Sequence, residues 1–314
     1  MTDNIHKAVA VIGPTAAGKT KLAIALARKY QGEIISADSR QVYKGMDIGT
    51  GKDLDDYYNN GQPIPYHLID IVEPTENFDV ANYQRLARQA LTDILSRQYL
   101  PIVVGGSGLY LQALIDNYQF SSVPPDNSLR QQLEKLSIQE LYQKLSETAP
   151  ALANKLNNSD RHNHRRLVRY LEIILNKPTN QPVHNSNQDI INWLILGIDY
   201  PKEILEQRIY DRLIQRLENE DMIGEVYRLH EQGVDWRRLE SFGLEYRFIS
   251  RYLREQLDYD QMVEQLYVAI CQFAKRQKTW FKRWEKQGRE IHWLNINNPL
   301  EEAESLIDKF LYNI

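Results

Sequence analysis

The chain has 314 residues, room for one large domain or two modest ones, and its hydrophobic fraction of 42% and charged fraction of 25% are typical of globular proteins. The net charge of −4 excludes a globally cationic nucleic-acid coat protein but not local basic patches. A single Cys271 excludes an internal disulfide and a cysteine-rich zinc site, and the absence of a secretory signal or a long apolar run predicts a cytoplasmic protein without membrane contact.

Apolar runs alternate with helical patterns over the first hundred residues. We expect strands at 8–13, 33–39, 67–72 and 100–106, and helices at 19–30 and 79–98. Strands that alternate with helices indicate βαβ units around a parallel sheet. The expected fold class is therefore α/β.

The pattern changes between about 121 and 188, where short helical stretches are punctuated by proline-rich segments and no convincing strand occurs. An apolar run at 192–201 predicts that the sheet resumes there, and 202–314 is mostly helical apart from "IHWLNI". We therefore expect a P-loop NTPase-like core from 1–120 and 189–314 with helical C-terminal parts, and an all-helical insertion at 121–188.

The stretch "GPTAAGKT" matches GxxxxGK[ST], which ordinarily marks an ATP-binding protein, a GTPase or a kinase. It follows a predicted strand and opens a predicted helix, so a glycine turn without a ligand is a poor alternative. The expected phosphate-binding residues are Gly13, Pro14, Thr15, Ala16, Ala17, Gly18, Lys19 and Thr20. Lys19 should reach the terminal phosphate, and the Thr20 hydroxyl should ligate Mg²⁺.

An acidic residue that could hold the metal in phosphoryl transfer is missing from "PIVVGG", which ends in glycines. Asp38 instead follows the second predicted strand, and the carboxyl ends of parallel strands face the ligand crevice. It could serve a kinase as a metal or hydroxyl ligand, act as a general base for another acceptor, or merely cap a helix. We expect Asp53, Asp55 and Asp56 of "KDLDDYY" to lie in a solvated loop.

Two predicted amphipathic helices carry cationic faces. In "RHNHRRLVRYLEIIL" (161–175) the arginines fall opposite the apolar residues, and in "FAKRQKTWFKRWEK" (273–286) Phe273, Trp280, Phe281 and Trp284 fall on one face and the bases on the other. Each face taken alone could simply be solvated. Together with a phosphate site they favour a polyanionic partner such as RNA.

These motifs together resemble those of the tRNA dimethylallyltransferases (tRNA isopentenyltransferase, or IPP transferase, family). The resemblance spans nearly the whole chain: "GPTAAGKT", "SADSRQVYKGMDIGT" (36–50), "HLID" (67–70), "GGSGLYLQAL" (105–114), "RRLVRYLE" (165–172) and "AKRQKTWF" (274–281) occur in the family's order. Departures are "SFGLEYRFI" (241–249) where members carry a GYRE-like motif, and "YLE" in place of ALE.

The resemblance implies that the loop binds dimethylallyl diphosphate and that the amine of the adenine 3′-adjacent to the anticodon is alkylated, with Mg²⁺ as cofactor. It implies catalytic roles for Asp38 as general base, Thr15 near the scissile oxygen and Lys19 on the leaving diphosphate. It implies tRNA contacts by Asp38, Ser39, Arg40, Gln41, Ser107, Arg165, Arg166, Leu167, Val168, Arg169, Gly243, Tyr246, Arg247, Lys275 and Arg276. The anticodon stem-loop would be the partner of a monomeric protein.

Three alternatives remain open at this point. An adenylate dimethylallyltransferase acting on free AMP, ADP or ATP shares the loop and Asp38 but needs no basic helices. A P-loop small-molecule kinase would use Asp38 on a substrate hydroxyl. A non-catalytic RNA-binding protein would retain a loop that no longer works.

Overall fold

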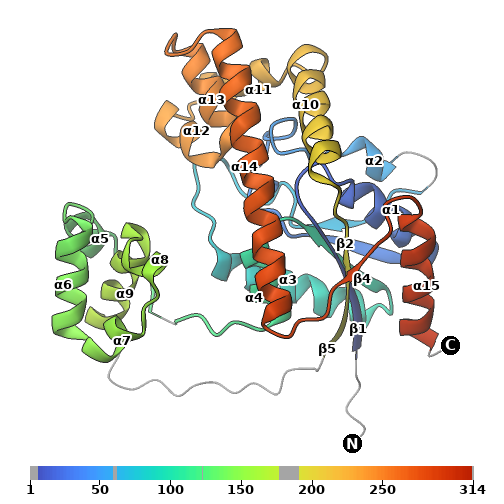
Figure 1. The fold of residues 1–314 in the computed structure, drawn as a ribbon, viewed down its shortest axis with the longest axis horizontal. Helices are drawn as coiled ribbons and strands as arrows, with labels where there is room; N and C mark the ends of the chain where they lie inside the picture. Colours follow the sequence, from blue (N-terminus) through green and yellow to red (C-terminus); the bar gives the residue numbers. More distant parts are fainter. Residues whose placement is uncertain (1–5, 59–61, 122, 177–190, 313–314) are drawn as a thin grey trace, which may run out of the picture. The chain divides into compact units, whose positions relative to one another are not determined.

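The computed structural model describes residues 6–58, 62–121, 123–176 and 191–312. Its strands are β1 (His6–Ile12), β2 (Gly32–Ser36), β3 (Tyr66–His67), β4 (Leu100–Gly105), β5 (Ile191–Gly197) and β6 (His292–Trp293). They form one parallel sheet in the order β3-β2-β4-β1-β5-β6. Figure 1 labels β1, β2, β4 and β5 of this sheet. The predicted α/β class with a parallel sheet is confirmed.

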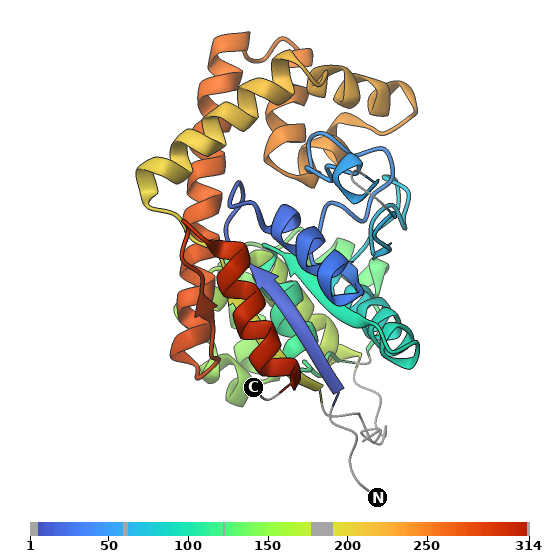
Figure 2. The same cartoon turned by 90° about the vertical axis from the view of Figure 1, so that its right-hand side faces the viewer.

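Strand β1 is apolar throughout its second half because both faces of the sheet are covered. Val9 and Val11 belong to the core that contains helices α1 (Lys19–Tyr30) and α15 (Pro299–Tyr312), the pair in front of the sheet in Figure 2. Ala10 and Ile12 belong to the opposite core. That core contains α3 (Val80–Ser96), α4 (Gly108–Ile115) and the end of α14 (Tyr259–Lys286). The alternation follows from the period of two in a strand.

A helical lobe lies between β5 and β6 in the chain. It contains the helices α10 (Lys202–Glu218), α11 (Met222–Glu231), α12 (Trp236–Phe242) and α13 (Leu244–Leu253). The 28-residue helix α14 connects this lobe to the sheet, because its first half packs Met262 and Leu266 in the lobe whereas its second half packs Phe281 and Trp284 against the sheet. Figure 1 shows this long helix running between the two.

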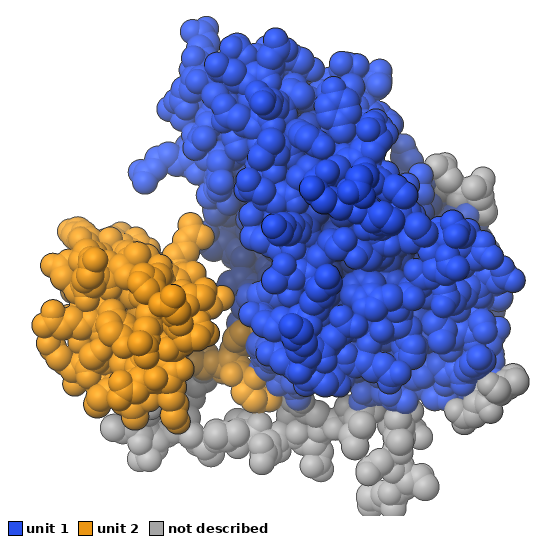
Figure 3. All heavy atoms as spheres, viewed as in Figure 1, with its two compact units in different colours: residues 1–118, 189–314 blue, residues 119–188 orange. Residues whose placement is uncertain are grey.

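The chain divides into two compact units, residues 1–118 with 189–314, and residues 119–188, which are coloured separately in Figure 3. The second unit holds helices α5 (Asn127–Leu133), α6 (Ile138–Thr148), α7 (Pro150–Lys155), α8 (Asn158–Arg161) and α9 (His164–Leu175). It has an apolar core of its own, with Leu141, Leu145 and Leu171 fully buried. The proline-rich "NKPTNQPVHNSN" segment lies outside the described residues from Lys177 onward.

The strand predicted at 67–72 is wrong over most of its length, since β3 contains only Tyr66 and His67. Leu68 and Asp70 have φ angles of 63° and 56°, in the left-handed region that a strand cannot continue through. Asp70 instead pairs with the fully buried ammonium group of Lys52. Within the described residues, no helix combines the length and the apolar character needed to cross a bilayer.

Candidate active site

The loop between β1 and α1 depends on two glycines. Gly18 has a φ of 85°, in the left-handed region that favours glycine, and it precedes the first turn of α1. A Cβ atom at Gly13 would lie 2.3 Å from the carbonyl oxygen of Ile198, so no larger residue fits there. Glycines at these positions let the loop backbone approach an anion at the N-terminus of α1, where the helix dipole favours negative charge.

Lys19 folds back over this loop, and its Nζ donates a hydrogen bond to the carbonyl oxygen of Pro14 at 2.7 Å. Burial, assisted by the charge of Arg212, lowers the pKa of Lys19 to about 8, while Asp38 opposes the shift. A bound anion would favour the protonated ammonium, because an opposite charge nearby raises the pKa of a lysine.

Three arginines on one face of α10 belong to the same region. Arg208 Nε donates to the carbonyl oxygen of Ala16 at 2.9 Å, and Arg212 donates to the hydroxyl of Thr15. Burial, together with the neighbouring Arg216, lowers the pKa of Arg212. None of the three was predicted from the sequence, although their spacing of four residues is the signal that places them on one helix face.

Asp38 lies two residues beyond β2, at the carboxyl edge of the sheet. Its Oδ1 accepts the backbone N–H of Arg40 at 2.8 Å, which fixes the carboxylate. The backbone N–H of Ser39 donates to the hydroxyl of Ser107 at 3.2 Å. The segments after β2 and β4 are therefore tied together beside Asp38.

Gln41 connects this edge to the loop that follows. Its Oε1 accepts a hydrogen bond from the hydroxyl of Ser36 at 2.8 Å, and its Nε2 donates to the carbonyl oxygen of Gly51 at 2.9 Å. Both the oxygen and the nitrogen of the Gln41 amide are therefore hydrogen-bonded within the protein. These two bonds hold the half-buried side chain at the cavity wall.

A cavity of about 1020 Å³ gathers much of the predicted site. Of the predicted residues it is lined by Thr15, Ala16, Gly18, Lys19, Thr20, Asp38 and Gln41. Unpredicted residues in its lining include Asp53, Asp55, Asp56, Arg208, Arg212 and Arg216. Ser39, Arg40 and Ser107 adjoin Asp38 but do not line this cavity. A carboxylate and a cluster of cations thus face one space.

The prediction that the acids of "KDLDDYY" lie in a solvated loop is wrong in part. Residues Asp55–Tyr58 form the short helix α2, and the acids line the cavity. The cause is Tyr57, whose buried side chain anchors the segment in the core against α1. Arg216 donates to Asp53 at 3.2 Å.

The cavity offers the hard oxygen ligands that Mg²⁺ prefers. Thr20, with its hydroxyl, and Asp38 and Asp53, with their carboxylates, are among the residues that line it. Among the residues that the structure describes, no group of three His, Cys, Asp or Glu side chains could hold a metal by itself. This donor set suits Mg²⁺, which is commonly bound through one or two protein oxygens together with phosphate oxygens and water.

The "GLEYR" region provides support behind the cavity. Tyr246 is 1% exposed, which corrects the expectation that its side chain contacts tRNA, and its hydroxyl donates to Glu225 at 2.7 Å. Gly243 lies beside the side chain of Arg40, and Arg247 donates to the carbonyl oxygen of Glu240 at 3.2 Å. Burial raises the pKa of the neighbouring residue Glu245, against the opposing effects of its own backbone N–H, Arg212 and Arg216.

On α14, Lys275 and Arg276 are exposed as predicted for a cationic face. Phe273 is exposed as well, at 38%, so its predicted place on the apolar face is wrong. The buried face consists of Ala274, Gln277, Phe281 and Trp284, which follow the 3.6-residue period more closely. This period places Gln277 on the buried face, and its Oε1 accepts the backbone N–H of Thr15 at 2.8 Å, a contact with the phosphate loop that was not predicted from the sequence.

Leu167 and Val168 of α9 are buried in the core of the second unit at 0% and 5% exposure. These side chains pack the helix and cannot themselves face an RNA, which corrects that expectation. Their burial orients the opposite face of α9, where Arg165 is exposed.

The other two arginines of this segment are ion-paired within the second unit. Arg166 pairs with Asp160, and Arg169 pairs with the fully buried carboxylate of Glu172. Glu172 also accepts from Arg130 at 2.7 Å, and Arg130 and Arg169 lower its pKa against the effect of burial. Arg169 thus has a structural task that the sequence did not indicate.

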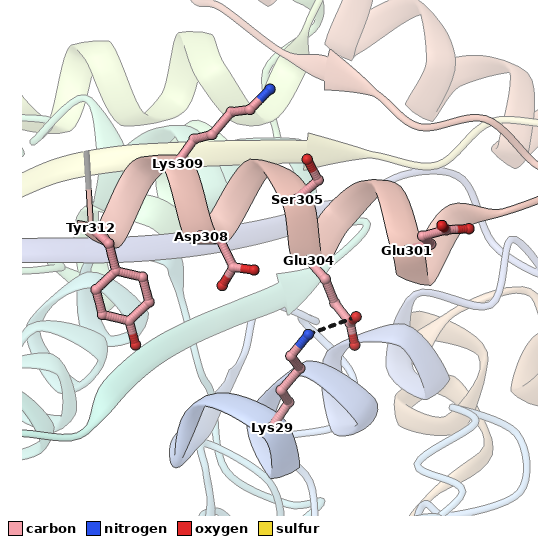
Figure 4. Close-up of a pocket in the computed structure, with 7 residues that line it drawn as sticks. All are labelled: Lys29, Glu301, Glu304, Ser305, Asp308, Lys309 and Tyr312. Carbon is pink, nitrogen blue, oxygen red and sulfur yellow. Dashed lines mark ion pairs between the residues drawn. The ribbon is translucent and has the colours of Figure 1, made fainter. Parts of the chain in front are cut away.

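A second hollow, of about 700 Å³, runs along α15 and contains none of the predicted site residues. Figure 4 shows Glu304 and Asp308 on this helix with Lys29 of α1 across from them. The Lys29 ammonium pairs with Glu304 at 2.7 Å. Asp308 accepts a hydrogen bond from the hydroxyl of Tyr30 at 2.8 Å, and the hollow lies apart from the predicted site, so we assign it no ligand.

Comparisons with known proteins find relatives that cover nearly the whole chain. Residues 41–284 match the family model described as IPP transferase. The chain is 46% identical to tRNA dimethylallyltransferase 1 of Syntrophus aciditrophicus, over 91% of this chain and 92% of that protein. Among solved structures, the full-length tRNA isopentenylpyrophosphate transferase of Bacillus halodurans superposes with a TM-score of 0.70 at 33% identity, covering 98% and 97% of the two chains. A eukaryotic dimethylallyltransferase described as acting on tRNA gives a TM-score of 0.81 at 25% identity, covering 98% and 80%.

A parallel sheet whose β1 runs into a GxxxxGK[ST] loop, with cations and a carboxylate at one cavity, defines a P-loop α/β enzyme. Within that class, the chain belongs to the IPP transferase family, a family of prenyltransferases.

Proposed function

We propose that the protein transfers the dimethylallyl group of dimethylallyl diphosphate to the exocyclic amine of the adenine 3′-adjacent to the anticodon of tRNAs, with release of diphosphate. The observation that carries this proposal is one cavity whose lining includes Asp38, Lys19 and Arg212. The names of the relatives, tRNA dimethylallyltransferases, support the same reaction.

The donor diphosphate would bind where the phosphate loop and α10 meet. Lys19 and Arg212 now donate to groups of the loop itself, and a diphosphate would offer them stronger acceptors. As the allylic C–O bond breaks, its electron pair stays on the diphosphate. Cations already in place stabilise that developing charge without further reorganisation.

The acceptor chemistry is assigned to Asp38. The amine nitrogen of adenine forms a bond to the allylic carbon, and the proton that it loses passes to the Asp38 carboxylate. The backbone N–H of Arg40 holds this carboxylate in place. The hydroxyl of Thr15, next to Arg212, is assigned to the scissile oxygen.

Mg²⁺ would be held by Thr20 with diphosphate oxygens and water, where it would neutralise charge on the leaving group. The exposed Arg165, Lys275 and Arg276 are assigned to the phosphate backbone of tRNA. The target adenine must leave the stack of bases to reach the cavity. We further propose a cytoplasmic monomer, since the cavity is complete within one chain and the proposed acceptor is tRNA.

The test is transfer of a labelled dimethylallyl group, in the presence of Mg²⁺, to two acceptors in parallel. One is an unmodified tRNA with adenine after the anticodon, and the other is free AMP. Label in the tRNA alone is the expected result. Label in AMP would instead establish an adenylate dimethylallyltransferase, and label in neither acceptor would contradict the proposed reaction.

A further inference from the structure

Gln277 is a buried polar side chain to which the proposed reaction so far assigns no role. It lies on the buried face of α14 and is 7% exposed. A long polar side chain is seldom buried to this extent unless its hydrogen bonds are satisfied. Those bonds go to two backbone segments that border the cavity.

The two bonds fix the amide in one orientation. Gln277 Oε1 accepts the backbone N–H of Thr15 at 2.8 Å, and Gln277 Nε2 donates to the carbonyl oxygen of Gly106 at 2.9 Å. A single amide supplies one acceptor and one donor side by side, which neither a carboxylate nor an ammonium does. The approach is close: a Cβ atom at Gly106 would lie 2.3 Å from Nε2.

The contact at Gly106 continues to the acceptor side of the site. The next residue, Ser107, donates its backbone N–H to the carbonyl oxygen of Ala37 at 3.3 Å, and its hydroxyl accepts from the N–H of Ser39. These contacts hold the backbone on both sides of Asp38. A chain of hydrogen bonds therefore runs from Thr15 through Gln277 to the segment that carries the base.

We propose that Gln277 is a positioning residue that fixes the phosphate loop and the Asp38 segment at the separation that group transfer requires. The inference rests on the proposed function, in which Thr15 serves the donor and Asp38 the acceptor. A transfer between two bound substrates depends steeply on their alignment, and a misplacement of about 1 Å can cost about 100-fold in rate.

The test compares Gln277→Met with Gln272→Met. Both replace an amide by an apolar side chain of similar length on α14, but Gln272 is exposed. At saturating tRNA and donor, we expect kcat of Gln277→Met to fall at least about tenfold, with tRNA affinity within about twofold of the parent, and Gln272→Met to match the parent. Normal kcat in Gln277→Met, or a loss confined to tRNA affinity, would overturn the inference.

Failure of the proposed function has a different signature, since the unaltered protein would then transfer no label to tRNA. The contact between Gln277 and Thr15 can be followed independently by hydrogen exchange at the Thr15 amide. This amide should exchange faster in Gln277→Met than in the parent, and at the parent's rate in Gln272→Met. Unaltered exchange in both variants contradicts the positioning role whatever the reaction.

Gln277→Glu provides a second variant should the methionine variant fail to fold. Its ionised carboxylate still accepts from Thr15 but cannot donate to Gly106, whereas its protonated form can. We expect the ratio of its kcat to that of the parent to rise as the pH is lowered from about 8 to about 6, because burial beside a carbonyl oxygen favours the protonated form. A ratio that does not change with pH would contradict the inference.

Discussion

Asp38 and Lys19 show how much the site depends on single charged groups. We assign the proton-accepting role to Asp38, whose carboxylate is oriented by one backbone N–H. Asp38→Asn keeps the shape but removes the basicity, so we expect kcat to fall by about 10²- to 10⁴-fold with tRNA affinity within a few fold. Single-turnover transfer assays measure this, with the exposed Asp260→Asn as the control. Undiminished turnover would remove Asp38 from the mechanism.

Lys19 gives the site a pH dependence with a definite sign. Burial and the charge of Arg212 lower its pKa from 10.5 to about 8, so it loses its proton as the pH rises through about 8. Diphosphate binds the protonated form better and must take up a proton above that pH. We expect pyrophosphate affinity to fall above about pH 8 more steeply in the parent than in Lys19→Arg, because arginine stays charged.

Isothermal titration calorimetry of both proteins between about pH 7 and about pH 9 measures these affinities. The protonation of pyrophosphate itself changes equally in the two experiments, so a difference between the proteins reports the protonation of Lys19. Equal pH dependence in the two proteins would show that Lys19 is already fully charged when empty.

At the scale of elements, α11 and α13 clamp the loop that lines the cavity. Glu225 of α11 accepts three backbone N–H groups, those of Asp47, Ile48 and Gly49, at 2.8, 2.6 and 3.0 Å. It also accepts the hydroxyl of Tyr246 of α13. One buried carboxylate thus fixes a segment that contains no regular structure, and with it one wall of the site.

Glu225→Gln tests this clamp. The amide has one oxygen for four donors and places an NH₂ group against the others, so we expect the free energy of unfolding to fall by about 1–3 kcal/mol. Urea unfolding measures the change, and Glu231→Gln, an exposed position on the same helix, should leave it within about 0.5 kcal/mol. A stable Glu225→Gln variant would mean that the loop holds its shape without the clamp.

The elements that could be predicted from the sequence are those with local signals. Helix α1 was predicted with the observed bounds, and the strands before and after it to within a few residues, because buried strands and amphipathic helices have short periods. Arg212 and Gln277 were missed because they meet Thr15 from about 197 and 262 residues away along the chain. No local pattern reports which helix will pack over the loop.

At the scale of the molecule, a net charge of −4 coexists with exposed cations that we assign to tRNA binding. Arg165 is exposed, whereas Arg169 compensates the buried Glu172. We expect Arg165→Gln to weaken tRNA binding and lower its salt slope by about 1 without a change in stability.

Arg169→Gln should also destabilise the second unit, by roughly 1–3 kcal/mol, because Glu172 would lose one of its two arginines. Binding measured over a range of salt concentrations, together with thermal unfolding, distinguishes the two variants. If Arg165→Gln binds tRNA like the parent at every salt concentration, that arginine is merely solvated.

The helical insertion was anticipated from the loss of strand patterns, and the return to the sheet from the apolar run after it. The order of the strands in the sheet was not anticipated, since a parallel sheet places together segments that are far apart in the chain. In the structure β5 pairs with β1 over seven residues, from His6 opposite Ile191 to Ile12 opposite Gly197.

That pairing has a consequence for synthesis of the chain. A ribosome must make residues 119–188 before the partner of the free edge of β1 exists, which takes on the order of ten seconds at the usual rates of translation. During this interval an apolar strand has an open hydrogen-bonding edge, the state most prone to aggregate. The second unit, with its own core, can fold meanwhile, so a chain stalled near residue 188 would be a client for chaperones even though the phosphate loop is already complete.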